Sequence, residues 1–307
     1  MPFTVLDGGT ATELVRLGHS SIDGDALWSA RLLYSHPDVV KQVHKNFLEA
    51  GSNLAVTTSY QASVGGFMEH LHITNSEAIE LIQRSVHLAR NACDEVAQSQ
   101  GTAPGLVAGS VGPYGACLLD GSEYTGAYMD ALSDEEILEW HKPRLQALVS
   151  AGVDLVAIET IPSQREAELL VRLIEQEFPD SKAYVTFSCK NETEVCHGEQ
   201  FRDAVASVSS STNVEAVGLN CTAPQYVTPL LKSIQGLKLQ KPIIVKPNSG
   251  ESWTHHAGWA GRDSVQEFSS LVSEWVEHGA TWIGGCCRVY PEDIRKIACI
   301  LKSLQTI

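Results

Sequence analysis

The feature of this chain that most constrains its fold is an alternation of short β-type runs with longer helical stretches. Eight runs rich in branched apolar residues stand at residues 3–7, 53–59, 106–110, 154–159, 183–188, 215–220, 242–246 and 281–284. Strands that alternate with helices pair in parallel, because each helix returns the chain to the end where the previous strand began. Eight such units in 307 residues predict an α/β fold, the (β/α)8 or TIM barrel.

The junctions between these segments carry signals of their own. A glycine that can adopt the left-handed conformation of a helix end precedes three of the β-type runs, at Gly51, Gly152 and Gly279. Three Ser/Thr-x-x-Glu patterns predict capping boxes at helix starts: Thr74 to Glu77, Ser133 to Glu136 and Ser163 to Glu166. No low-complexity linker divides the chain, so we predict one domain over residues 1–307 with long βα loops at the C-terminal rim.

The charge balance limits the classes of partner. The formal net charge is −15, whereas nucleic acids and anionic membrane surfaces are bound by basic footprints. The longest uncharged run, residues 102–119, is broken by Pro104 and Pro113, so it predicts no membrane span. The amino terminus has no basic segment before an apolar one. We therefore expect a cytoplasmic protein with reduced thiols that acts on small molecules, and the oligomeric state stays open.

Three cysteines follow β-type runs and predict a metal site. Cys221 ends the run GLNC, and Cys286 and Cys287 end the run IGGCC. Three thiolates can hold one zinc and leave a position open, which is the catalytic arrangement. The separation of 65 positions is too long for a zinc knuckle. The alternative is that these are buried packing residues, although adjacent strand residues point to opposite faces and cannot both lie in one core.

Polar residues gather at the carboxyl ends of the other predicted strands. Glu159 follows the apolar run at 155–158, where an unpaired carboxylate is costly, so we expect it to meet a substrate ammonium or backbone amides. Asp7 opens an Asp-Gly-Gly run, which is also a common turn signal. Lys246 could form a Schiff base, as in an aldolase, but a lysine before Pro247 is expected to be solvated.

Two predicted βα loops, residues 112–133 and 247–263, are longer than barrel turns usually are, which is typical of substrate contacts and lids. Their aromatic candidates are Tyr114, Tyr124, Tyr128, Trp253 and Trp259. The adjacent His255 and His256 are expected at the surface, with a zinc role as the alternative. The remaining cysteines are expected to be packing residues: Cys93, Cys117, Cys189, Cys196 and Cys299.

Together these motifs resemble the homocysteine S-methyltransferase family over almost the whole chain. The matching stretches are DGGTATEL at 7–14, AGSNLAVTTSYQAS at 50–63, AGSVGPYGACLLDGSEYTG at 108–126, AGVDLVAIET at 151–160, GLNC at 218–221, KPNSGE at 246–251 and IGGCCR at 283–288. The separated cysteine combined with the GGCC run is the most specific of these features.

The resemblance implies a barrel in which Cys221, Cys286 and Cys287 bind one zinc ion, with the homocysteine thiolate as fourth ligand. It implies that Glu159 holds the ammonium group of the substrate. It also places Asp7, Gly8 and Thr57 at the amino-acid site.

Within the family, the stretch at 111–126 resembles the branch that takes its methyl group from S-methylmethionine or S-adenosylmethionine. We align Gln61 with the place where the betaine-using branch has a tyrosine. The chain is too short for folate- and cobalamin-binding modules. The resemblance thus predicts transfer of a methyl group from a sulfonium donor to homocysteine, giving methionine. The alternatives are a selenocysteine Se-methyltransferase and a non-catalytic zinc-binding or redox-sensing barrel.

Overall fold

The computed structural model describes residues 2–254, 258–260 and 268–305. Eight parallel strands form one sheet in the order β1-β10-β7-β6-β5-β4-β3-β2. These strands are β1 (Thr4–Val5), β2 (Leu54–Val56), β3 (Leu106–Val111), β4 (Leu155–Ile161), β5 (Ala183–Phe187), β6 (Val214–Asn220), β7 (Ile243–Lys246) and β10 (Ala280–Ile283). Each lies within three residues of a predicted run, so the predicted (β/α)8 barrel is confirmed.

The barrel closes between β1 and β2 through side chains as well as backbone. The Asn53 amide donates to the Val5 carbonyl at 2.8 Å, and the Val5 amide donates to Asn53 Oδ1 at 2.8 Å. Three residues after Asn53, at the end of β2, the Val56 amide donates to Asp7 Oδ2 at 2.9 Å. The Asp7 carboxylate therefore has a structural role at this seam.

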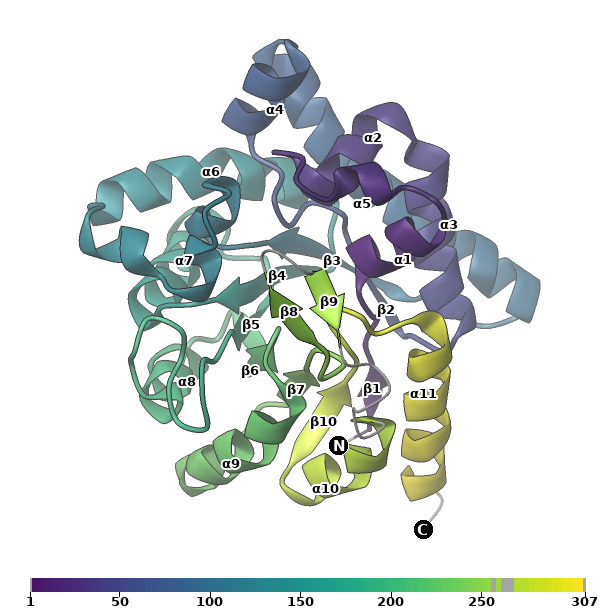
Figure 1. Cartoon of the computed structure of the whole chain (residues 1–307), viewed down its shortest axis with the longest axis vertical. Coiled ribbons are helices and arrows are strands. Elements are labelled where there is room, and N and C mark those ends of the chain that lie inside the picture. Colours follow the sequence, from purple (N-terminus) through teal and green to yellow (C-terminus); the bar gives the residue numbers. More distant parts are fainter. Residues whose placement is uncertain (1, 255–257, 261–267, 306–307) are drawn as a thin grey trace.

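Helices surround the strands (Figure 1). They are α1 (Thr10–Arg16), α2 (Leu32–Ser35), α3 (Pro37–Glu49), α4 (Val64–Leu71), α5 (Asn75–Gln100), α6 (Asp134–Ser150), α7 (Gln164–Glu177), α8 (Phe201–Ser209), α9 (Pro224–Ile234), α10 (Val272–Glu277) and α11 (Pro291–Gln305). Their apolar faces and the outer strand faces form the larger core, and the barrel interior forms a smaller one that includes Leu6, Ala108 and Tyr184. None of the described helices is both long enough and apolar enough to cross a bilayer.

Most of the predicted junctions are confirmed. Capping boxes are present at Thr74 and at Ser133, and Gly51, Gly152 and Gly279 all have positive φ angles. The prediction of a third capping box, from Ser163 to Glu166, was wrong. Ser163 Oγ instead donates to Glu199 Oε1 at 3.0 Å, because the Glu166 side chain turns inward to buried partners described below.

All eight cysteines are free thiols. Cys93 is buried on α5, as the helical spacing predicts, and Cys189 and Cys196 are also buried. Cys117 is half-buried. The packing prediction was wrong for Cys299, which is exposed because its place on α11 faces away from the buried side formed by Ile294, Ile297 and Leu301.

His44 makes the stability of the fold sensitive to acid. Its side chain is buried on α3, neither ring nitrogen has a hydrogen-bond partner among the described residues, and burial lowers the pKa of His44 to about 4 from 6.5. The unfolded chain gains a proton here below pH 6.5 while the folded chain does not, so stability falls as the pH drops toward 4. We expect His44 to account for about 3 kcal/mol of that loss.

Denaturant unfolding at a series of pH values measures this loss. His44→Leu should flatten the profile between pH 7 and pH 4, whereas His87→Leu, at an exposed position on the neighbouring helix α5, should not. Parallel profiles for wild type and His44→Leu would contradict the assignment.

Candidate metal and substrate site

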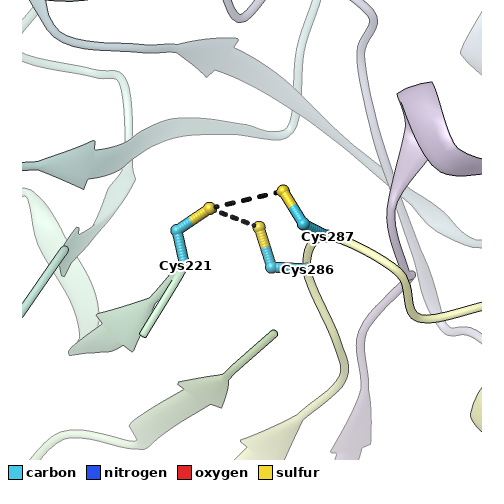
Figure 2. Close-up of side chains that lie close together, drawn as sticks. All are labelled: Cys221, Cys286 and Cys287. Carbon is cyan, nitrogen blue, oxygen red and sulfur yellow. Dashed lines mark hydrogen bonds between the residues drawn. The ribbon is translucent and has the colours of Figure 1, made fainter. Parts of the chain in front are cut away.

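The three predicted cysteines meet at the C-terminal rim of the barrel. Cys221 directly follows β6, and Cys286 and Cys287 lie in the turn after β10. Their sulfur atoms all lie within 4.8 Å of one another, with Cys221 Sγ 2.9 Å from Cys286 Sγ and 3.8 Å from Cys287 Sγ. Figure 2 shows the side chain of Cys221 pointing across to the other two. Strand β7 separates β6 from β10 in the sheet, so the barrel brings these thiols together.

The turn after β10 depends on two glycines that allow close packing. A Cβ on Gly284 would lie 2.6 Å from Leu6 Cβ, and one on Gly285 would lie 2.2 Å from Val289 Cγ1. The backbone then bonds to the neighbouring turn, with the Cys286 amide donating to the Pro247 carbonyl at 2.7 Å. The backbone leaves the strand here, and close approach is the reason that glycine is needed.

The donor set fits a zinc ion. Tetrahedral zinc with Zn–S bonds of about 2.3 Å separates its sulfur ligands by roughly 3.8 Å. Cys221 and Cys287 are separated by that distance, while Cys221 and Cys286 are closer, at 2.9 Å, but well beyond a disulfide bond of about 2.05 Å. Donation from Cys221 and Cys287, with the nearby charge of Lys246, holds the pKa of Cys286 well below its usual range.

Below the thiols, Lys246 lies between two acidic side chains. Its Nζ is 2.8 Å from Asp7 Oδ1 and 3.7 Å from Glu159 Oε2, and the Glu159 Oε1 accepts from Ser110 Oγ at 2.5 Å. Burial raises the pKa of Asp7 and that of Glu159. Burial alone would lower the pKa of Lys246, but the two carboxylates hold it well above its usual range.

The expectation that Lys246 is solvated was wrong, because it is only 5% exposed and its ion pair compensates the burial. A lysine held protonated is a poor nucleophile, so this environment disfavours a Schiff base. Among the described residues, Glu159 accepts from Ser110 Oγ and lies 3.7 Å from Lys246 Nζ, and its contact with a substrate ammonium stays a prediction.

The other two predicted amino-acid contacts have structural partners. Thr57 Oγ1 accepts from the Ser110 amide at 2.9 Å and lies 2.7 Å from Ser59 Oγ. A Cβ on Gly8 would lie 2.6 Å from the Val289 carbonyl, so only glycine fits there. Both positions are at the strand ends near Asp7, and their contact with a substrate stays a prediction.

The loop from Gly112 to Ser133 brings one tyrosine to the thiols. Tyr124 is 46% exposed, and its hydroxyl lies 3.8 Å from Cys221 Sγ. Tyr128 is instead buried, donates to Glu166 and packs against Tyr114, with ring centroids 5.5 Å apart. Of the three tyrosines in this loop, Tyr124 is thus the one that we find in contact with the described cysteine cluster. Gln61 is also buried, and its Nε2 donates to the Ala26 carbonyl at 3.1 Å.

The second long loop contains a hairpin that the sequence did not predict. Strands β8 (Ser252–Thr254) and β9 (Gly258–Ala260) pair antiparallel, with Trp253 opposite Trp259. His255 and His256 lie outside the described residues.

Two buried charged residues whose role the sequence analysis did not predict hold the loops in place. Arg144 donates to the carbonyls of Ser59, Tyr60 and Gly112, at 3.1, 2.6 and 3.1 Å, and so ties the loop after β2 to the loop after β3. Glu166 accepts from the Tyr114 amide at 2.8 Å and lies 3.0 Å from His141 Nε2. A signal was available, since His141 and Arg144 share the helical spacing of the buried Ile137, Leu145 and Leu148.

Comparison with known proteins bears on what this site does. A family model described as homocysteine S-methyltransferase matches residues 4–301. The chain is 39% identical to a betaine-homocysteine S-methyltransferase of Drosophila melanogaster, covering 96% of this chain and 93% of that protein. It is 40% identical to homocysteine S-methyltransferase YbgG of Bacillus subtilis, covering 99% of this chain and 96% of that protein. It is 38% identical to a selenocysteine methyltransferase of Astragalus bisulcatus, covering 98% of this chain and 93% of that protein.

A solved structure is similar over the same length. The crystal structure of the homocysteine methyltransferase MmuM from Escherichia coli in its metallated form matches with a TM-score of 0.85 and 36% identity, covering 98% of this chain and 96% of that one.

Proposed function

This chain belongs to the homocysteine S-methyltransferase family, and on that premise we propose that it transfers a methyl group from a sulfonium donor to homocysteine, giving methionine. The observation that carries the proposal is the meeting of three thiols within 4.8 Å at the C-terminal rim of the barrel, the rim where TIM-barrel enzymes have their active sites.

We assign Cys221, Cys286 and Cys287 as the ligands of one zinc ion. Three protein ligands leave one position for a substrate atom. Bound zinc would favour the deprotonated form of the homocysteine thiol at neutral pH, as it does for coordinating thiols in general.

The acidic residues below the thiols fit the amino-acid part of the acceptor. Glu159 Oε1 already accepts from Ser110, so Oε2 is the oxygen that we assign to the ammonium group. Asp7, Gly8 and Thr57 form the surrounding wall at the ends of β1 and β2. A zwitterionic amino acid would thus have its ammonium group at Glu159 and its sulfur near the cysteines.

The methyl donor needs little from the protein besides binding and orientation. The thiolate sulfur forms the new S–C bond while the C–S⁺ bond breaks, and its electron pair stays on the sulfur of the donor. The leaving group is a neutral thioether, so no general acid is required. Tyr124 at the open side of Cys221 can place an aromatic face against the sulfonium, a contact worth about 0.5–2 kcal/mol. The loops held by Arg144 and Glu166 would orient the donor and exclude water.

A donor panel tests the proposal. We expect S-methylmethionine to be used best, S-adenosylmethionine less well, and betaine and methylfolate not at all, because the thioether that leaves a sulfonium is a far better leaving group than a tertiary amine. Methionine formation is measured with zinc-loaded protein, fixed homocysteine and equal donor concentrations. Betaine that matches S-methylmethionine would overturn the choice of donor, and methionine from no donor would favour a non-catalytic metal-binding barrel.

Selenocysteine is the second candidate acceptor, favoured by the similarity to the Astragalus bisulcatus selenocysteine methyltransferase. The same assay with selenocysteine in place of homocysteine separates the two. A higher kcat/KM for selenocysteine than for homocysteine would show that selenocysteine is the preferred acceptor.

A further inference from the structure

We infer that Lys246 is a positioning residue that Asp7 holds away from Glu159, so that Glu159 remains available to the ammonium group of the acceptor. The inference rests on the proposed function, because it describes how the acceptor binds at the same site. It gives Asp7 an indirect role, through Lys246, in place of direct contact with the substrate.

The distances separate the two carboxylates. Lys246 Nζ is within hydrogen-bond distance of Asp7 Oδ1, at 2.8 Å, but lies 3.7 Å from Glu159 Oε2, which is beyond it. Asp7 is itself fixed, because its other oxygen accepts from the Val56 amide at 2.9 Å. Lysine has a flexible stem, so its position between two acceptors depends on which one binds it better.

The hydrogen bonds of Glu159 leave one of its oxygens available. Oε1 accepts from Ser110 Oγ at 2.5 Å. In the part of the chain that the structure describes, no donor forms a hydrogen bond with Oε2. The side chain retains 9% of its surface exposed. The side chain is therefore not fully enclosed, and Oε2 is the oxygen that we assign to the ammonium group.

The charges of these three side chains favour a single further cation. Asp7 and Glu159 contribute two negative charges and Lys246 one positive charge, which leaves a net charge of −1. An uncompensated charge in a buried site is costly, and one ammonium group brings the sum to zero. An α-amino acid acceptor carries one such group.

Asp7→Asn should upset this balance. The asparagine Oδ1 can still accept from Val56, but its amide NH₂ then faces Lys246, and two donors cannot bond. Lys246 would turn to Glu159, neutralise it and compete with the substrate. We expect homocysteine to bind about 30-fold more weakly, as for the loss of one charge-assisted contact.

Removal of the lysine should restore binding. In Asp7→Asn/Lys246→Met the competing cation is absent, Glu159 again carries a net charge of −1, and the buried pair is removed as a unit. We expect an affinity for homocysteine within about threefold of wild type. In Glu159→Gln/Lys246→Met no such recovery should occur relative to Glu159→Gln, because the acceptor oxygen of the ammonium has lost its charge.

Calorimetric titration of homocysteine into the zinc-loaded protein, without donor, measures these affinities. Wild type, Asp7→Asn, Lys246→Met, the two double variants and Glu159→Gln are compared, with zinc content and unfolding temperature as controls for the site and the fold. If Lys246→Met does not fold, Lys246→Gln replaces it, since a glutamine amide carries no charge and can donate to the oxygen of either aspartate or asparagine at position 7.

Recovery in the Asp7→Asn/Lys246→Met variant supports the inference when Asp7→Asn keeps the zinc content and unfolding temperature of wild type, because damage to the fold by an unpaired Lys246 is then excluded as the cause of weak binding. A double variant as weak as Asp7→Asn, with wild type binding homocysteine normally, overturns it and gives Asp7 a direct contact with the ammonium. Wild type that binds no homocysteine contradicts the proposed function and this inference with it.

Discussion

Serine in place of any one of Cys221, Cys286 or Cys287 should abolish zinc binding and lower methionine formation on the order of 1,000-fold. A serine hydroxyl stays protonated at neutral pH and is a harder, weaker ligand than a thiolate, so two cysteines alone would hold the ion poorly. The metal is assigned several kcal/mol of the rate acceleration, and each 1.36 kcal/mol corresponds to a factor of ten. Elemental analysis should find about one zinc per chain in wild type.

Two other cysteines provide matched controls for these variants. Cys93→Ser changes a buried thiol on α5, and Cys299→Ser changes an exposed thiol on α11, and both should keep their zinc and their activity. Full zinc content in any two of Cys221→Ser, Cys286→Ser and Cys287→Ser would remove the metal assignment.

Glu159→Gln should weaken homocysteine binding by about 10- to 100-fold while zinc remains bound. The substitution preserves the shape of the side chain and removes its charge, and charge-assisted hydrogen bonds contribute roughly 1.5–3 kcal/mol. The cysteine ligands are untouched, so the effect belongs to the amino-acid site. Calorimetric titration of homocysteine and zinc analysis of the same samples measure the two quantities.

Glu215→Gln is the matched control, because Glu215 is an exposed residue on β6, at the opposite end of that strand from Cys221. It should bind homocysteine as wild type does. An unchanged dissociation constant in a folded Glu159→Gln variant would rule out the assigned contact with the ammonium group.

The barrel and the positions of the thiols could be predicted from the sequence because both depend on local patterns. Alternation of β-type runs with capped helices specifies parallel strands, and parallel strands place the residues that follow them at one rim. Cys221, Cys286 and Cys287 each follow such a run, so their meeting required only the topology. The helix ends at Gly51 and Thr74 were likewise readable, since a glycine with positive φ and a capping box involve residues within one turn.

The partners of the buried charges were decided only by the tertiary structure. Lys246 precedes a proline, and from the sequence we expected its side chain to be solvated. It lies instead between Asp7 and Glu159, which are 239 and 87 positions away along the chain. Glu166 fits a capping box, yet it turns to Tyr128 and His141. A local pattern specifies which hydrogen bonds a side chain can make with its own turn. Burial adds a larger cost for any charge left unpaired, and the partner that offsets that cost comes from whichever strand or helix the barrel places beside it.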